Sequence, residues 1–306
     1  MWPTRKTQFT ANYAILTEFS ATRRPLPGVA EARVRETLAL QMVASVRRLD
    51  YTHILTIRDI APGRADPLSP LFDPERAAIL HARAGKMEEA FWLIFLATHF
   101  GKHANYGWRR LRDVYSGLGD GTWTWERYRA DPESFRVWLS ANWQHIGGGF
   151  GNHRKYESLD TLSTKGTASV LNSYFNWIGD GSLQAERFTR LIREAGNDPH
   201  TIFDHIYKNM NVLRFGRLGK FDFLCLLGRL RLLPINPGSP YLKGASGPLR
   251  GARLLFTGNS ENSTGVALLE TWLAELNGEL RLDNQVIEDS LCNWQKSPAA
   301  FIHFQG

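Results

Sequence analysis

Apolar side chains recur at three- and four-residue intervals along much of this chain, which is the spacing of one face of an α-helix. One such stretch covers residues 31–49 and carries the polar residues Gln41 and Ser45 within its apolar stripe. Residues 87–100 are apolar on almost every side, which predicts a helix buried at the centre of a bundle. We therefore expect a mainly α fold.

Helical spacing continues through the second half of the chain. Asp73 and Asp198 each precede a proline, a pairing that predicts an N-cap residue followed by the first turn of a helix. Only residues 51–57 and 253–257 have the composition of strands. Further helices are expected over residues 167–177, 183–194 and 201–213, with a last one capped by Asp283, and an irregular connection over residues 58–72.

A short turn with glycines and basic residues joins two of these helices. The helix predicted over residues 201–213 is followed by Gly216, Arg217, Gly219 and Lys220, after which the apolar pattern resumes. The two glycines allow a tight turn and let backbone amides approach an anion, and the start of a helix adds the positive end of its dipole. A DNA phosphate suits this place. An ordinary helix corner with solvated basic residues fits the same pattern.

Composition narrows the class of protein and of partner. The 37 Lys and Arg residues exceed the 30 Asp and Glu residues, so the formal charge of +7 favours an anionic partner such as nucleic acid. No apolar run is long enough to cross a bilayer and no signal peptide is evident, so we expect a soluble, cytoplasmic protein without a membrane partner. The two cysteines, Cys225 and Cys292, fit reduced core residues and are too few for a cluster held by four thiolates.

Five segments together give the chain a resemblance to a known family. They are residues 38–48, 99–103, 215–222, 241–253 and 288–296. In these segments the chain resembles the alpha-glutamyl/putrescinyl thymine pyrophosphorylase family, clade three, and the likeness runs through nearly the whole chain. That family in turn resembles the helix-hairpin-helix DNA glycosylases. The resemblance implies a glycosylase-like helical bundle with a groove between two lobes, one of about residues 85–235 and one of residues 1–84 with 236–306.

The resemblance also implies an activity. It points to a monofunctional DNA glycosylase that removes hypermodified pyrimidines from double-stranded DNA and leaves abasic sites, as a defence against phages that carry such bases. Glucosylated 5-hydroxymethylcytosine is the base we expect first, and the enzyme is expected to act as a monomer without a cofactor. Two alternatives stand beside this one: an enzyme of hypermodified thymine biosynthesis, and a non-catalytic DNA-binding module.

The catalytic carboxylate that the glycosylase resemblance implies is absent from its expected position. Breaking the C1′–N bond passes through an oxocarbenium-like transition state, so a carboxylate near the sugar is needed. Helix-hairpin-helix glycosylases usually supply an Asp about one helix after the hairpin. Residues 223–260 contain neither Asp nor Glu, and the corresponding position falls near Lys243. Either the acid comes from elsewhere in the chain or the mechanism differs.

The predicted C-terminal helix offers a replacement acid. One of its faces carries Gln285, Asp289, Cys292, Asn293 and Lys296, so a carboxylate, an amide and an amine lie in a row. We expect Asp289 to stabilise the sugar cation or activate water, Asn293 to read the base or hold that water, and Lys296 to bind phosphate or the carboxylate. An Asp289 paired with a neighbouring basic residue on a solvated face fits the same spacing. Asp222, at the start of the second hairpin helix, is the second choice for the acid.

The remaining expectations concern binding. Lys243 and Arg250 extend the predicted phosphate surface, and for Lys243 this role is preferred over amine attack at C1′. His99 and His103 have the spacing of two metal ligands on one helix, but no third ligand is evident, so no metal is expected. The base pocket is expected to be lined by Gln41, Ser45, His99, Lys102 and Gln285.

Overall fold

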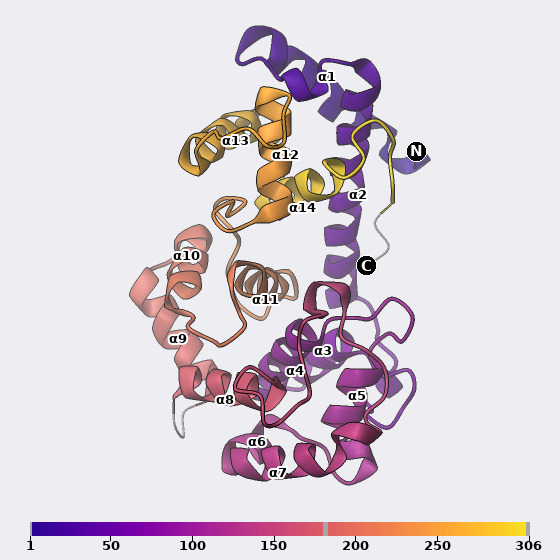
Figure 1. The fold of residues 1–306 in the computed structure, drawn as a ribbon, viewed down its shortest axis with the longest axis vertical. Helices are drawn as coiled ribbons and strands as arrows, with labels where there is room; N and C mark the ends of the chain where they lie inside the picture. Colours follow the sequence, from indigo (N-terminus) through magenta and orange to yellow (C-terminus); the bar gives the residue numbers. More distant parts are fainter. Residues whose placement is uncertain (1, 180–182, 304–306) are drawn as a thin grey trace. The chain divides into compact units, whose positions relative to one another are not determined.

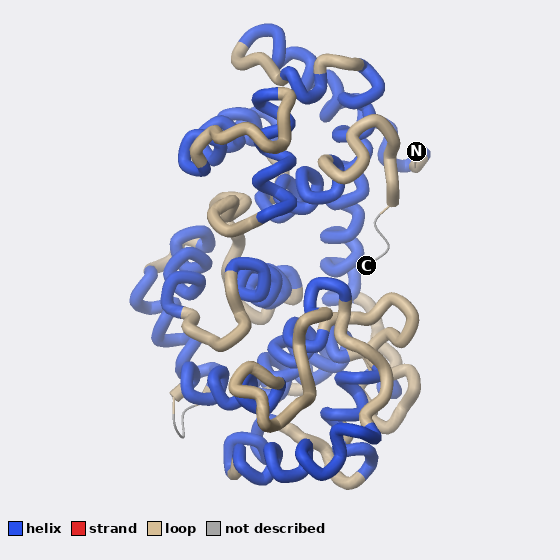
Figure 2. Tube along the Cα trace, viewed as in Figure 1, coloured by secondary structure: helices blue, strands red, loops and turns tan. Residues whose placement is uncertain are grey.

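The computed structural model describes residues 2–179 and 183–303, and within these ranges the chain forms helices and loops but no β-strand (Figure 2). The predicted mainly α class is confirmed. The chain divides into two compact units, unit 1 with Met1–Thr52 and Pro237–Gln305, and unit 2 with His53–Asn236. The first boundary lies within the long helix α2 (Ala32–Ile57), whereas the sequence suggested a lobe boundary near residue 84.

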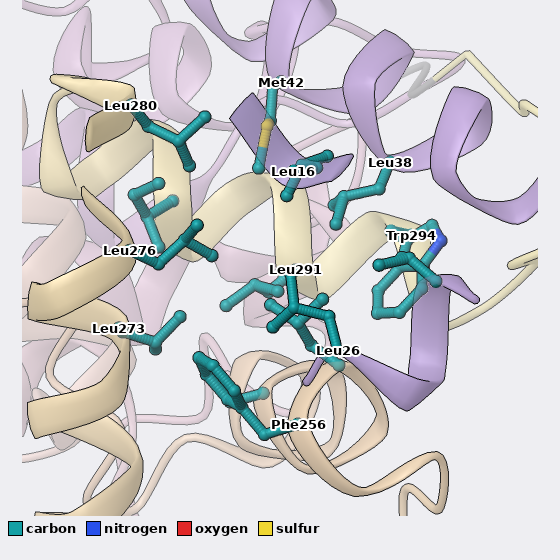
Figure 3. Packing of buried hydrophobic residues seen from close by; sticks show 14 of the residues in the cluster. Leu16, Leu26, Leu38, Met42, Phe256, Leu273, Leu276, Leu280, Leu291 and Trp294 are labelled. Atoms are coloured by element: carbon teal, nitrogen blue, oxygen red, sulfur yellow. The ribbon is translucent and has the colours of Figure 1, made fainter. Parts of the chain in front are cut away.

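Unit 1 has a core formed by the apolar stripes of its helices (Figure 3). Leu16, Met42 and Leu291, which are far apart in the sequence, are all buried in it. Close packing of two helices depends on Gly251, because a Cβ atom there would lie 2.4 Å from the carbonyl oxygen of Leu291. The helices of this unit, besides the first part of α2, are η1 (Pro3–Arg5), α1 (Lys6–Thr22), η2 (Pro27–Val29), α12 (Ser246–Thr257), α13 (Val266–Leu280) and α14 (Asn284–Trp294) (Figure 1).

Unit 2 is built around α4 (Met87–Phe100), in which every residue from 90 to 100 is buried, as predicted. Aromatic rings fill the space around it; the rings of Phe95 and Tyr174, for example, stack with centroids 3.7 Å apart. The other helices of this unit are η3 (Pro62–Arg64), α3 (Pro74–Arg83), α5 (Arg109–Tyr115), η4 (Gly117–Gly119), α6 (Trp125–Ala130), α7 (Pro132–Asn142), η5 (Trp143–His145), η6 (Asn152–Arg154), α8 (Thr167–Ile178), α9 (Gln184–Ala195), α10 (Pro199–Asn209) and α11 (Arg217–Arg229).

The predicted helix starts are confirmed by their hydrogen bonds. The side chain of Asp73 accepts the amide of Arg76 at 3.1 Å, and that of Asp198 accepts the amide of Thr201 at 2.7 Å. Asp283 accepts a backbone amide of α14 in the same way. Each carboxylate satisfies an amide that the first helical turn leaves without an intrahelical partner.

Residues 51–57 and 253–257, whose composition is that of strands, are the last turns of α2 and α12. Two local predictions are wrong, and the structure gives the reasons. His99 and His103 are not one helical turn apart, because α4 ends at Phe100 and Gly101 then takes a φ of +63°. Lys296 lies beyond α14, which ends at Trp294.

Three predicted properties concern cysteines, membranes and metals. Cys225 and Cys292 are not joined by a disulfide. Among the described residues, no helix has the length and apolarity that crossing a bilayer requires. In the same part of the chain, no three His, Cys, Asp or Glu side chains are grouped so that they could hold a metal ion.

Candidate functional site

The predicted hairpin joins α10 to α11, and the left-handed residue of its turn is Arg214 rather than one of the two glycines. Arg214 has a left-handed backbone with a φ of +63°, whereas Gly216 has an ordinary φ of −70°. The Arg214 side chain holds this turn in place: Nε donates to Oε1 of Glu157 at 3.1 Å, and Nη2 donates to the carbonyl of Tyr156 at 3.0 Å. The expectation that Gly216 is needed for the tight turn is therefore wrong.

Gly219 is needed for a different reason, which is the close approach of a buried guanidinium group. A Cβ atom on Gly219 would lie 2.7 Å from Nη2 of Arg154. Arg154 is only 6% exposed, its guanidinium lies 4.9 Å from the ring centroid of Phe215, and its Nη1 donates to the carbonyl of Arg214 at 3.4 Å. A positive charge is thus fixed directly beneath the first turn of α11.

This charge adds to the field at the start of α11. Burial lowers the pKa of Arg154, but a guanidinium keeps its proton in proteins. Within the described residues, Nη2 of Arg154 has no hydrogen-bond acceptor. The first hydrogen bond at this end of the helix runs from the Lys220 amide to the Gly216 carbonyl at 3.0 Å, so the helix does not use the amides of its first turn. This end therefore favours an anion.

The basic side chains of the hairpin differ in their orientation. Lys220 turns back to α10, where Nζ donates to the carbonyl of Tyr207 at 3.3 Å and lies 5.4 Å from the ring of that tyrosine. Burial in this position lowers the pKa of Lys220. Arg217 lies with its guanidinium 4.4 Å from the ring of Phe221. An anion at the start of α11 would reach Lys220 only after a change of its rotamer.

Asp222 lies one helical turn beyond Gly219 on α11. Its side chain is partly buried, and burial raises the pKa of its carboxyl group. No hydrogen bond from another residue of the described ranges reaches this carboxylate. The nearby positive charges, which lower its pKa in part, belong to His153, Arg154, Arg217 and Arg229. We call Arg154, Arg214, Gly219 and Asp222 the hairpin cluster.

A second carboxyl group beside this cluster was missed by the sequence reasoning. Burial raises the pKa of Glu75, in the first turn of α3, and the charge of Asp73 raises it further. The charge of Arg229 lowers the pKa of both Glu75 and Asp222, so both carboxyl groups lie within its electrostatic reach. In the sequence, Glu75 follows a helix cap, where a glutamate has an ordinary role as partner of the helix dipole.

His99 lies inside unit 2, within electrostatic reach of the hairpin cluster. Its side chain is fully buried, and Nε2 lies 3.0 Å from Oγ1 of Thr167. Because the Thr167 hydroxyl donates to the carbonyl of Ser158 at 2.8 Å, Nε2 must be the donor to Thr167. Burial lowers the pKa of His99 to about 3, helped by the charges of Arg154 and Arg214, so the ring is neutral. The structure leaves this predicted pocket residue no exposed surface.

A hydrogen-bonded network in unit 1 contains three of the residues predicted to share one face of the C-terminal helix, namely Asp289, Asn293 and Lys296. Asp289 accepts from Oγ of Ser45 at 2.6 Å and from Nη2 of Arg48 through one oxygen, and from Nδ2 of Asn293 at 2.7 Å through the other. Nζ of Lys296 donates to Oδ1 of Asn293 at 3.2 Å. The network links α2 to α14, and we call it the Asp289 network. Its five residues are Ser45, Arg48, Asp289, Asn293 and Lys296. The sequence did not anticipate Arg48 as its cation.

The other predicted binding residues are divided between the two units. Gln41 is buried in unit 1, where Nε2 donates to the carbonyl of Ile302 at 2.9 Å. Ser45 and Gln285 belong to the same unit, whereas His99 and Lys102 belong to unit 2. Lys243 is exposed in the loop before α12. Arg250, on α12, forms an ion pair of 2.6 Å with Glu261.

A comparison with known protein families concerns both the hairpin cluster and the Asp289 network. The sequence profile of alpha-glutamyl/putrescinyl thymine pyrophosphorylase clade 3 matches residues 33–306. The chain belongs to this family. The matched region contains the hairpin cluster as well as the Asp289 network. No curated protein and no solved structure matches the chain.

This member of the clade 3 family therefore contains two chemically different sites. The hairpin cluster combines an anion-favouring helix start with a carboxyl group whose lone pairs receive no hydrogen bond from the described residues. The Asp289 network combines a carboxylate, an amide and an amine whose hydrogen bonds are already paired. The first arrangement can bind a phosphate and stabilise a developing positive charge, and the second can hold a polar group or join two helices.

Proposed function

We propose that the chain is a DNA glycosylase that hydrolyses the N-glycosidic bond of a hypermodified pyrimidine and leaves an abasic site. Glucosylated 5-hydroxymethylcytosine in phage DNA is the substrate we propose first, and antiviral defence is the role. One observation carries the proposal: the carboxyl group of Asp222 belongs to the second turn of α11, the helix whose start favours an anion. A glycosylase needs this pair, a hold on the DNA backbone and negative charge beside the sugar.

Asp222 is the carboxyl group that we assign to the sugar cation. Burial destabilises its ionised form, and within the described ranges no hydrogen bond offsets this cost. A positive charge that develops beside such a carboxylate in the transition state is therefore stabilised more than beside a solvated one. The charges of Arg154 and Arg229 lower the pKa of this carboxyl group and so favour its ionised form.

Asp289 becomes the second choice for the acid, which reverses the order expected from the sequence. Its oxygens accept three hydrogen bonds, and the charge of Arg48 offsets its own. A carboxylate already neutralised in this way stabilises a sugar cation less. Asn293 and Lys296 stay proposed partners of Asp289 for a base or a phosphate.

The decisive experiment incubates the purified full chain with phage DNA that carries glucosylated 5-hydroxymethylcytosine and with unmodified DNA. Free base is measured by mass spectrometry and abasic sites by an aldehyde-reactive probe. We expect both products from the modified DNA only. Asp222→Asn should lower the rate of release by about 100-fold or more, the usual effect of removing one electrostatic group from an active site. Borohydride trapping tests amine attack separately.

Matched variants separate the two acids from a general effect of lost charge. Asp131 caps α7 with its side chain, and Asn caps helices equally well, so Asp131→Asn should leave the release rate unchanged. If Asp289→Asn abolishes release while Asp222→Asn does not, Asp289 is the acid and our order is wrong. If the unchanged chain releases no base from modified DNA, the glycosylase proposal itself is refuted.

The family's name supports a second candidate function, an enzyme of hypermodified thymine biosynthesis. Such an enzyme would alter the substituent of the base and leave the sugar linkage whole. Digestion of the treated DNA to nucleosides would then yield a nucleoside of new mass without any abasic site. DNA binding that Asp222→Asn and Asp289→Asn leave unchanged, with no product from either assay, would instead indicate a non-catalytic binding module.

A further inference from the structure

The turn next to the hairpin presents an aromatic ring to solvent. Tyr156 is 79% exposed, compared with 54% for Tyr51 and Tyr106 and 45% for Trp143, so it is the most exposed large aromatic residue in the described ranges. Tyrosine rings usually bury most of their apolar surface within the protein or against a partner. The exposure of Tyr156 therefore has no explanation in the packing of unit 2.

The backbone that carries this ring is tied firmly to the hairpin. The amide of Glu157 donates to the carbonyl of Arg154 at 2.9 Å and closes a turn, with Tyr156 at its third position. Arg214 donates to the carbonyl of Tyr156 at 3.0 Å and to the carboxylate of Glu157 at 3.1 Å. The Glu157 side chain is only 4% exposed, so the carboxylate of this ion pair is shielded from water. The turn thus has a fixed position beside the hairpin.

A cation accompanies the ring. Nζ of Lys155 lies 5.1 Å from the ring centroid of Tyr156, and both side chains are exposed. An exposed aromatic ring next to a lysine is the combination with which proteins hold unpaired nucleotides, the ring stacking on the base and the cation binding the phosphate. The ring face is sequence-tolerant, because every base has a π-face.

We propose that Tyr156 stacks on an unpaired nucleobase of the DNA that the hairpin holds, with Lys155 at the adjoining phosphate. This inference rests on the proposed function, because base excision unpairs at least one nucleotide of the duplex. It adds a positioning residue that neither the hairpin sequence nor the family match singles out. Tyr156 would hold the opened DNA, whereas Asp222 would act on the sugar.

The test uses the full chain and two synthetic duplexes that contain 2-aminopurine. In one duplex the 2-aminopurine faces an abasic-site analogue and is unpaired, and in the other it pairs with thymine. Affinity is measured by fluorescence anisotropy of an end label, and stacking by quenching of the 2-aminopurine emission. We expect Tyr156→Ala to weaken binding of the unpaired duplex about 5- to 150-fold, the range for loss of one stacked base, and to abolish the quenching. Binding of the paired duplex should change less than twofold.

Three control variants make the result specific. Tyr156→Phe and Tyr156→Trp keep a ring and should keep the quenching. Tyr106→Ala removes another exposed tyrosine of the same unit, one that stacks on His103, and should change neither measurement. Because the Tyr156 ring is exposed, the urea midpoint of Tyr156→Ala should equal that of the unchanged chain.

Each remaining outcome decides a different proposal. If Tyr156→Ala weakens both duplexes equally, or neither, the stacking role is refuted even when modified base is released. If the quenching depends on Tyr156 but no base is released from modified DNA, the stacking role stands and the glycosylase proposal fails. If the unchanged chain binds neither duplex, the stacking role is refuted, and the glycosylase proposal is decided by base release from modified DNA alone.

Discussion

The two glycines of the hairpin should respond differently to the same substitution. Gly219→Ser would place a Cβ atom 2.7 Å from Nη2 and 3.1 Å from Nη1 of Arg154. Gly216→Ser would place its Cβ atom in open space, with no other heavy atom within 4 Å. Residue 216 is also the N-cap of α11, a position at which serine is favoured over glycine. The sequence alone treats the two glycines as equivalent.

The size of the effect follows from how little Arg154 can move. Its guanidinium is confined between Gly219 and the ring of Phe215, and only 6% of the residue is exposed. Forcing an extra atom into such a packed place costs about 1–3 kcal/mol. Gly219→Ser should therefore lower the free energy of unfolding by this amount. Gly216→Ser should leave it unchanged or raise it by a few tenths of a kcal/mol, since a serine cap is slightly better than glycine.

Urea unfolding followed by circular dichroism measures both variants, with the midpoints compared at equal slopes. Displacement of the first turn of α11 should also weaken DNA binding by Gly219→Ser, whereas Gly216→Ser should bind as the unchanged chain does. Equal unfolding free energies for the two variants would show that Arg154 does not lie against Gly219. Rescue of Gly219→Ser by Arg154→Ala, which makes room, would confirm the clash as the cause.

Three further predictions follow from buried and paired charges. Folding lowers the pKa of His99 from 6.5 to about 3. The contribution of the neutral His99 ring to the free energy of unfolding is therefore complete above pH 6.5. This contribution is lost as the pH falls toward 3, at up to roughly 1.4 kcal/mol per pH unit. Urea midpoints between pH 7 and 5 should fall less for His99→Gln, and parallel curves would contradict the burial of a neutral ring. Asp289→Asn should lower the unfolding free energy by about 1–3 kcal/mol because it removes the partner of Arg48, and Arg48→Met with Asp289→Leu should recover part of this loss. Lys220→Glu should weaken binding to DNA of any sequence, and the slope of log Kd against log salt concentration should become smaller by about 1. Lys86→Glu, in the same unit, should change neither quantity. An unchanged salt slope for Lys220→Glu would mean that the Lys220 side chain stays on α10 when DNA binds.

Much of the fold could be predicted from local signals in the sequence. The continuous apolar stretch over residues 87–100 predicted a buried central helix, and α4 has these bounds. Asp73 and Asp198 predicted helix starts, because a cap residue and a first-turn proline act within a few residues of each other. The spacing of Asp289 and Asn293 placed them on one helix face, where they now share a hydrogen bond.

Only the tertiary structure decided what each functional residue contacts. Arg154 lies in the sequence more than sixty positions before Gly219, yet its guanidinium occupies the space that a side chain at residue 219 would need. Asp289 finds Arg48 on a helix from the other end of the chain. Local spacing specifies which residues share a face, but burial, pKa and charge pairing depend on elements brought together by the core, so the preference for Asp222 over Asp289 could come only from the folded protein.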